Sequence, residues 1–154
     1  MLCVWWKMTG IVHFELLPSN TTVTAQLYSY QLEGVHATLN KTHLAPVNRK
    51  GVILLHDNAR PHVAKMVHEK IAQLGWEVLP HPPYSPDLVP SDYHLFRSLQ
   101  HYLGEKSYDK EADIKNDIQS FFDSKPLSFY ESGIRKLVEK WQHVVDNNGA
   151  YVID

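Results

Sequence analysis

The most constraining feature of the sequence is a strand–helix–strand pattern between residues 51 and 80. The run GVILLHD (51–57) is short and apolar up to its last two residues, which is typical of a strand covered on both faces. Pro61 suits the first turn of the helix that follows, and Gly75 suits its C-terminal cap. WEVLP (76–80) then predicts a second strand. This order predicts parallel strands in an α/β fold.

Segments before this unit predict a hairpin and a helix. MLCVWW and IVHFELL flank a short polar turn that contains Gly10, and they predict a β-hairpin. Residues 18–22 form a loop with helix-start chemistry, and residues 41–50 read as a polar loop. Between these loops the apolar residues fall near helical spacing, at Val23, Leu27, Tyr30, Val35 and Leu39.

The C-terminal half predicts a stiff loop followed by three helices. The prolines that recur from Pro80 to Pro90 exclude an α-helix there. Ser91 or Asp92 would cap the next helix, and a second helix is expected over about residues 110–122. The last helix has the clearest apolar stripe, formed by Ile134, Leu137, Val138, Trp141, Val144 and Val145. We expect this stripe to lie in the core, with a protein interface as the alternative.

Composition narrows the class of protein. The chain has 154 residues, which is room for one domain. Its net charge of −2 counts against a free-standing nucleic-acid binder, for which a clearly basic domain is expected. No apolar run is long enough to span a bilayer, and no secretory signal pattern is visible. Cys3 is the only cysteine, so no intrachain disulfide can form. We therefore expect an intracellular protein without a membrane partner.

Two aspartates are candidates for chemistry. Asp57 closes the apolar strand, at the end where ligand sites lie in open α/β sheets. It could instead cap the next helix, through Asn58 or a nearby amide. Asp92 follows the second strand and its proline loop, and alone it also suits an N-cap. Adjacent parallel strands would bring both carboxylates close enough to share a hard divalent cation. Asp87 is a rival for the role of Asp92, but it is more typical of a turn residue.

Six histidines are spread over the same region, at positions 56, 62, 68, 81, 94 and 101. No pair has the HExxH spacing and no cysteine cluster accompanies them, so a zinc site has weak support. Most fit structural roles, and His56 is the one that could orient a metal-binding Asp57, with Asn58 on its other side.

No glycine-rich phosphate loop or GxSxG elbow is present, so no small-molecule cofactor is predicted. Cys3 is a poor nucleophile because an apolar hairpin would raise its pKa.

Several long motifs resemble one family: MLCVWW, GIVHFELLP, LLHDNARPH, WEVLPHPPYSPDLVPSDYHLF and FYESGIRKLVEKWQHVVDNNGAYV. They look like the catalytic domain of mariner-type DNA transposases, and the similarity covers essentially the whole chain. The resemblance implies an RNase H-like fold, a mixed sheet flanked by helices, and three aspartates that bind Mg²⁺ or Mn²⁺. Asp57 matches the second family aspartate, in HDN, and Asp92 rather than Asp87 matches the third, in PSDYHLF. The positions differ by 92 − 57 = 35, which is the mariner spacing.

The resemblance also implies the chemistry and the partners. Two metal ions about 3.5–4 Å apart would activate the attacking water or 3′-hydroxyl and stabilise the leaving oxygen. DNA would be the substrate, in the nucleus, and a homodimer is a candidate assembly. The first family aspartate lies in a TGDE-like motif upstream of MLCVWW, and no residue of this sequence matches it. Lys7 stands where the family usually has an acidic residue, at a position that is not a metal ligand.

We therefore expect residues 1–154 to form one partial RNase H-like domain, missing its first strand and the helix-turn-helix DNA-binding domains that precede it in the family. Such a chain would be inactive alone, because two carboxylates hold Mg²⁺ poorly without the third. The alternative is a non-enzymatic module for nucleic-acid binding or dimerisation. A third and weaker alternative is a nuclease that recruits another carboxylate, such as Glu15.

The missing strand would also affect stability. In the RNase H-like sheet this strand is central, between the hairpin and the GVILL strand. Its loss leaves both neighbours with unpaired backbone groups, unless the hairpin closes directly onto GVILL. We expect marginal stability, with melting below about 55 °C.

Overall fold

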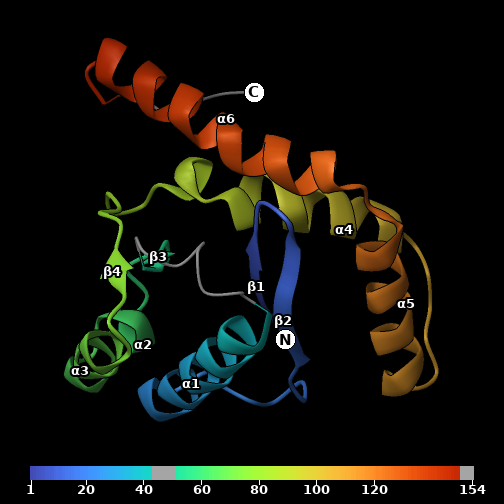
Figure 1. Cartoon of the computed structure of the whole chain (residues 1–154). Helices are drawn as coiled ribbons and strands as arrows, with labels where there is room; N and C mark the ends of the chain where they lie inside the picture. Colours follow the sequence, from blue (N-terminus) through green and yellow to red (C-terminus); the bar gives the residue numbers. More distant parts are fainter. Residues whose placement is uncertain (43–50, 150–154) are drawn as a thin grey trace. The chain divides into compact units, whose positions relative to one another are not determined.

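The computed structural model describes residues 1–42 and 51–149 (Figure 1). Its elements follow the chain in the order β1 (Leu2–Lys7), β2 (Gly10–Leu16), α1 (Ala25–Thr42), β3 (Ile53–Leu54), α2 (Arg60–Val63), α3 (Lys65–Leu74), β4 (Glu77–Val78), the 3-10 helix η2 (Pro86–Leu88), the π-helix η3 (Ser91–Phe96), α4 (Arg97–Leu103), α5 (Glu111–Ser124) and α6 (Leu127–Asp146). The mixture confirms the α/β class. Among the described helices, none is long and apolar enough to cross a membrane.

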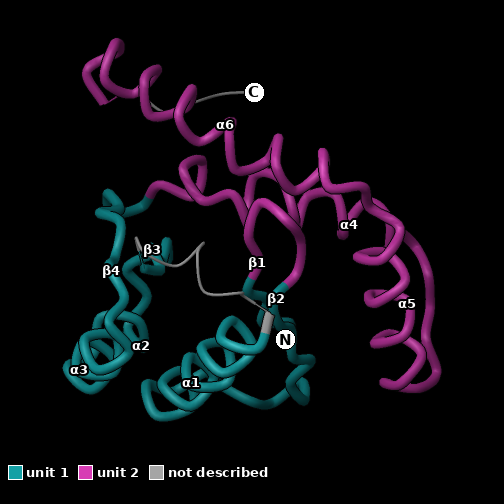
Figure 2. The backbone as a smooth tube through the Cα atoms, in the orientation of Figure 1, with its two compact units in different colours: residues 1–5, 12–84 teal, residues 6–11, 85–154 magenta. Residues whose placement is uncertain are grey.

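The chain divides into two compact units (Figure 2). Unit 1 consists of residues 1–5 and 12–84, and unit 2 consists of residues 6–11 and 85–154. The hairpin formed by β1 and β2 supplies residues to both units. Each unit has its own set of buried apolar side chains.

The hairpin is confirmed. β1 pairs with β2, and Gly10 has a φ of +130°, which favours glycine at the start of the second strand. Backbone hydrogen bonds between Leu17 and Met1 close the open end, with the Leu17 amide 2.7 Å from the Met1 carbonyl oxygen. Every residue of the two strands is only half-buried.

The parallel pair of strands is also confirmed, but it is short. β3 pairs with β4 in parallel, with Ile53 opposite Glu77 and Leu54 opposite Val78. The expectation that β3 is covered on both faces is wrong for Ile53, whose side chain is 60% exposed. β3 has a single strand neighbour in the described residues, since β1–β2 and β3–β4 form two separate two-stranded sheets. The hairpin therefore does not close onto the GVILL strand.

α1 packs against α3 and supplies most of the core of unit 1. Its buried stripe is Tyr28, Leu32, Val35 and Leu39, whereas Tyr30 is 71% exposed. The sequence pattern placed Tyr30 in the stripe because it counted from Val23, which precedes the helix. Of the loop predicted over residues 41–50, the first two belong to α1 and residues 43–50 lie outside the described residues.

The helix predicted after β3 is broken in two. Pro61 lies in the first turn of α2, as predicted, and Gly75 caps α3 with a φ of +74°. Between them Ala64 is extended, with a ψ of 145°, and ends α2 after one turn. The break separates the turn that contains His62 from the helix that buries Val67 and Ile71.

The proline-rich loop runs from unit 1 into unit 2 at residue 85, and it contains the 3-10 turn η2 and no α-helix, as predicted. The predicted N-cap is wrong. Pro90 occupies the N-cap position of η3, and no side chain caps this helix. The Ser91 hydroxyl instead accepts a hydrogen bond from the Trp6 indole, at 2.9 Å, and Asp92 lies one residue inside the helix.

The core of unit 2 is formed by η2, η3 and helices α4 to α6, through Leu88, Leu95, Leu99, Ile118, Phe121, Phe122 and Tyr130. The face predicted to be buried on α6 is partly wrong, because Val138 is 74% exposed and Val145 is 67% exposed. The face that is buried contains Tyr130, Gly133 and Lys140. The small Gly133 and the aliphatic part of the Lys140 side chain therefore determine which face of α6 is buried.

Candidate active site

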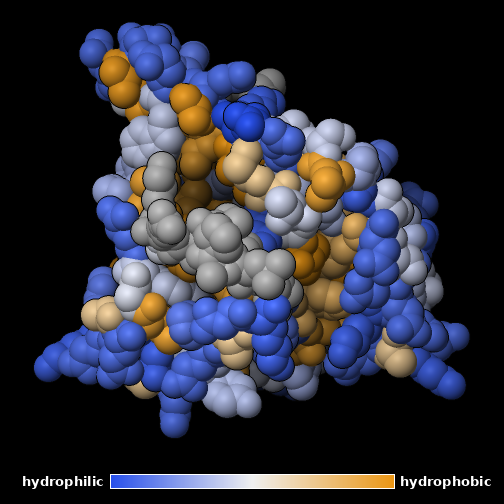
Figure 3. Space-filling model, in the orientation of Figure 1, coloured by the Kyte–Doolittle hydropathy of each residue, from blue (hydrophilic) through white to orange (hydrophobic). Residues whose placement is uncertain are grey.

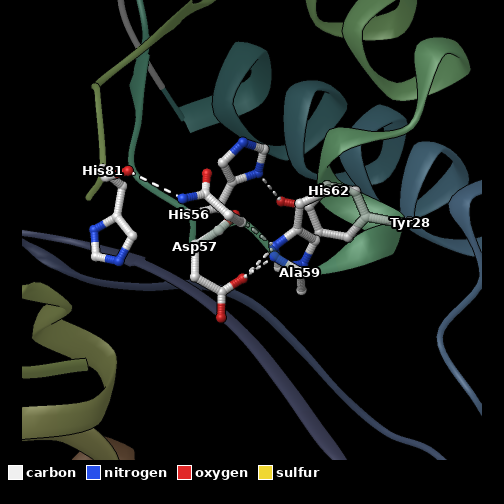
Figure 4. A network of polar contacts seen from close by, with 7 residues as sticks. Tyr28, His56, Asp57, Ala59, His62 and His81 are labelled. Atoms are coloured by element: carbon white, nitrogen blue, oxygen red, sulfur yellow. Dashed lines mark hydrogen bonds and ion pairs between the residues drawn. The ribbon is translucent and has the colours of Figure 1, made fainter. Parts of the chain in front are cut away.

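Asp57 lies just beyond the carboxyl end of β3, as predicted (Figure 4). One carboxylate oxygen, Oδ1, accepts a hydrogen bond from the Ala59 amide at 3.1 Å and lies 2.7 Å from Nδ1 of His62. The bond to Ala59 tightens the turn immediately before α2, so the local turn role is part of what Asp57 does. Its side chain is 51% exposed, and no contact within the described residues uses Oδ2. The carboxylate is thus oriented through one oxygen and open through the other.

His62 is the residue that sequence analysis missed at this position. The sequence analysis predicted a structural role for His62, yet its imidazole ring contacts the Asp57 carboxylate. The ring stacks on His56 with centroids 4.9 Å apart and an interplanar angle of 2°. The available signal was the HDNARPH spacing, because Pro61 begins a helical turn that brings residue 62 back toward residue 57.

His56 supports this arrangement from behind. Burial and the neighbouring His62 lower the pKa of His56 to about 4, so its ring is neutral at pH 7. Burial, together with the Asp57 charge, raises the pKa of Tyr28, which stays protonated. The Tyr28 hydroxyl therefore donates to Nδ1 of His56, at 2.8 Å. His56 acts on Asp57 through the stacked His62 ring.

Asn58 ties the strand end to the loop after β4. Its side-chain amide donates to the His81 carbonyl oxygen at 3.1 Å. The buried Nδ1 atom of His81 has no hydrogen-bond partner within the part of the chain that the structure describes. The two residues that flank Asp57 thus have different roles. Asn58 ties the end of the strand to the backbone at His81, and His56 stacks on the His62 ring.

Asp92 lies on η3 in unit 2, and its side chain is exposed. Its amide donates to the Val89 carbonyl oxygen at 2.9 Å. The rival Asp87 also belongs to unit 2, inside the turn η2. Asp57 belongs to unit 1, so the two candidate carboxylates come from different compact units. Among the described residues, no group of three or more histidine, cysteine or acidic side chains is arranged to hold a metal ion.

Glu15, the weaker candidate, is engaged by its neighbours in unit 1. One of its oxygens lies 3.0 Å from Nε2 of His13, and the other accepts from the Gln31 amide at 2.8 Å. Burial alone would raise the pKa of Glu15, but the hydrogen bonds from His13 and Gln31 hold it below its ordinary value. Gln31 is almost fully buried, so this carboxylate helps to anchor the hairpin on α1.

A basic pocket lies on unit 2. Its volume is about 450 Å³, and it is lined by Arg97, Ser98, His101, Tyr102, Phe121 and Lys125. The Lys125 ammonium group lies 5.0 Å from the centroid of the Phe121 ring, and none of the described residues that line the pocket is acidic. Basic groups beside aromatic rings suit an anionic ligand such as a phosphodiester.

Comparisons with known proteins agree with this picture. Residues 1–49 match the family model "Transposase (partial DDE domain)". The chain is 45% identical to histone-lysine N-methyltransferase SETMAR of Homo sapiens, over 98% of this chain and 22% of that protein. It is 42% identical to Mariner Mos1 transposase of Drosophila mauritiana, over 99% of this chain and 44% of that protein. The chain therefore spans less than half the length of both curated relatives.

Solved structures extend the match to the fold. The Mos1 transposase catalytic domain with raltegravir and Mn has a TM-score of 0.93 at 42% identity, over 99% of this chain and 76% of that chain. The same domain with Mg gives the same values. A Mos1 paired-end complex with the left transposon end gives a TM-score of 0.91 at 42% identity, over 97% of this chain and 44% of that chain.

The fold is thus the RNase H-like fold of a DNA transposase catalytic domain. Within that class, the chain belongs to the mariner family.

Proposed function

We propose that this chain is a mariner catalytic domain in which Asp57 and Asp92 are ligands for Mg²⁺ or Mn²⁺, and that it does not cleave DNA by itself. The observation that carries the proposal is the position of both aspartates in the HDN and PSDYHLF motifs of a chain that belongs to the mariner family. The Mos1 catalytic domain has been solved with Mn and with Mg, which supports the choice of metal.

The carboxylates suit such an ion. Mg²⁺ and Mn²⁺ prefer hard oxygen ligands, and the Asp57 side chain is half exposed with Oδ2 open. When bound, a divalent ion would lower the pKa of an attacking water and stabilise the leaving oxygen of a phosphodiester. His62 would keep Oδ1 of Asp57 in one orientation through its 2.7 Å contact. His56 and Tyr28 would hold the His62 ring from behind.

The proposal of inactivity rests on the number of carboxylates. A phosphoryl-transfer site with two metals needs a ligand that bridges both ions, and the family's first aspartate has no match in this sequence. Within the described residues, no third acidic side chain joins either aspartate in a metal-binding group. Glu15 is already engaged by His13 and Gln31.

A plasmid-nicking assay tests this part of the proposal. The purified chain is incubated with supercoiled plasmid and Mn²⁺, and the open-circle product is measured against an Asp57→Ala variant. We expect both proteins to match the protein-free background. Mn²⁺-dependent nicking that disappears in Asp57→Ala would overturn the proposed inactivity.

A second candidate function is DNA binding without cleavage, and the basic pocket of unit 2 favours it. Arg97, His101 and Lys125 line one pocket with two aromatic side chains. The related Mos1 protein is known in a paired-end complex with transposon-end DNA. DNA binding would imply a nuclear location and would be compatible with a homodimer. Fluorescence anisotropy with labelled DNA tests the binding, and light scattering tests the dimer.

A further inference from the structure

α6 approaches η3 more closely than a side chain would allow. A Cβ atom placed on Gly133 would lie 2.7 Å from Cγ and 2.8 Å from Nε2 of the His94 ring, well inside van der Waals contact. Gly133 itself is buried in the middle of α6, where glycine is otherwise an unfavourable helix residue. The close approach to His94 is therefore the reason that this position holds glycine.

Residues on both sides of Asp92 are anchored through their side chains, those that follow it by α6 and the one that precedes it by Trp6. The Tyr93 hydroxyl donates to the Gly133 carbonyl oxygen at 2.5 Å, and Nε2 of His94 donates to the Phe129 carbonyl oxygen at 2.7 Å. On the preceding side, the Trp6 indole donates to the Ser91 hydroxyl at 2.9 Å. Three of the residues around Asp92 thus have side-chain anchors, while the Asp92 side chain is exposed.

Two further contacts hold the anchoring rings. The Trp6 ring stacks on His94, with centroids 6.4 Å apart and an interplanar angle of 20°. The buried Lys140 of α6 places its ammonium group 4.6 Å from the centroid of the Tyr93 ring. The His94 ring is therefore held by α6 and by Trp6, and the Tyr93 ring is held by two residues of α6, Gly133 and Lys140.

The anchored segment has an uncommon backbone. Residues Ser91–Phe96 form a π-helix, which is rare, leaves a wider turn than an α-helix and is frequently found at functional sites. A π-helix needs tertiary contacts to persist, since the α-helix is the preferred hydrogen-bonding pattern. The contacts from α6 meet this need at Tyr93 and His94.

We propose that Gly133 of α6, through Tyr93 and His94, is a positioning residue that fixes the π-helical turn bearing Asp92. Because Gly133 lacks a side chain, the His94 ring can pack against α6 at this position. The Gly133 carbonyl oxygen accepts the hydrogen bond from the Tyr93 hydroxyl. The two ring anchors follow Asp92 directly in sequence, so a shift of either ring moves the backbone that bears the carboxylate. The functional meaning of this position rests on the proposed role of Asp92 as a metal ligand.

The variant Gly133→Ala tests the proposal, with Gly34→Ala as its matched control. Gly34 also lies within a helix, but a Cβ there would meet nothing within 4 Å. The first readout is the NMR order parameter and chemical shift of the Asp92 amide in the 154-residue chain without metal. We expect Gly133→Ala to shift this amide and to lower its order parameter, and Gly34→Ala to leave both unchanged.

The second readout is Mn²⁺ titration, followed by paramagnetic broadening of the amides around residue 92. We expect Gly133→Ala to need at least threefold more Mn²⁺ for half-maximal broadening. Broadening that is unchanged in Asp92→Asn would show that Asp92 is not a ligand and would overturn the proposed function. The metal-free readout would still decide the positioning role.

Tyr93→Phe keeps the test decisive if Gly133→Ala does not fold. This change removes only the hydroxyl that donates to the Gly133 carbonyl oxygen and keeps the ring beneath Lys140. We expect the same direction of change at the Asp92 amide, with a smaller amplitude. An Asp92 amide that is unaffected in Tyr93→Phe and in every folded Gly133 variant would overturn the positioning role.

Discussion

The two candidate ligands, Asp57 and Asp92, lie in surroundings that are held in different ways. At Asp57 the contacts go to the carboxylate itself, from the His62 ring and the Ala59 amide. At Asp92 the described contacts go to the neighbours in sequence, which α6 and Trp6 hold in a π-helical turn. Orientation by a direct hydrogen bond depends on one polar side chain, whereas orientation through the backbone depends on the packing of a whole core. Changes near Asp57 should therefore act locally, and changes near Asp92 should act through folding.

The largest effect that separates the two regions is expected from Leu95→Ala. Leu95 is fully buried on the same π-helix as Asp92, so its loss leaves a cavity beneath that turn. We expect the free energy of unfolding to fall by about 2–5 kcal/mol. Urea unfolding followed by tryptophan fluorescence measures the change, and Leu127→Ala, at a residue that is 63% exposed, is the matched control. A loss below about 1 kcal/mol would mean that this turn does not depend on the core.

The next effect concerns Asp57. His62→Ala removes the ring that orients the carboxylate and should weaken Mn²⁺ binding by roughly 10–100-fold, with little loss of fold. His68→Ala, at an exposed histidine on α3, should leave binding unchanged. Calorimetric titration with Mn²⁺ measures both variants. Equal Mn²⁺ affinities in the two variants would show that His62 does not support metal binding at Asp57.

Acid should weaken the surroundings of Asp57. The pKa of His56 is about 4 in the folded chain, below the value of about 6.5 expected when the chain is unfolded. The unfolded state therefore binds the proton first, so the stabilising contribution is full above pH 6.5 and is lost as pH falls toward 4. Because the side chain is partly exposed, we expect a loss of only about 1–2 kcal/mol. Urea unfolding at pH 7 and pH 4.5 should show this loss in the wild type and a smaller one in His56→Gln.

The smallest effect is expected at the basic pocket, which shares unit 2 with Asp92. Lys125→Glu reverses a charge in the pocket and should weaken DNA binding by roughly threefold to tenfold at low salt. Lys115→Glu makes the same charge change on α5, at an exposed position outside the pocket. Anisotropy titrations at two salt concentrations compare the variants. Identical losses in both would indicate a general charge effect and no specific pocket.

Much of the fold followed from local rules. The turn around Gly10 predicted the hairpin, and Pro61 and Gly75 marked the ends of the helical segment between parallel strands. The position of Asp57 beyond β3 followed from the same pattern. These features depend on residues that act on their own backbone, so the sequence shows them directly.

The site and the last helix depended on contacts far apart in the chain. The His62 ring stacks on His56, which the Tyr28 hydroxyl holds from 28 residues earlier in the chain, and no local pattern marked that support. On α6 the apolar stripe with Val138 and Val145 suggested the wrong face, since packing is decided by Gly133 against His94. Hydrophobic periodicity cannot report a close approach that needs the absence of a side chain.

The most direct test of the central claim is a Mn²⁺ titration of the ¹⁵N-labelled chain, followed at the amides next to Asp57 and Asp92. The account predicts that both groups of amides broaden, that Asp57→Asn weakens the effect around residue 57, and that Asp92→Asn weakens it around residue 92. Broadening at only one aspartate, or an effect that these changes leave unaltered, would contradict the proposal that both carboxylates are metal ligands.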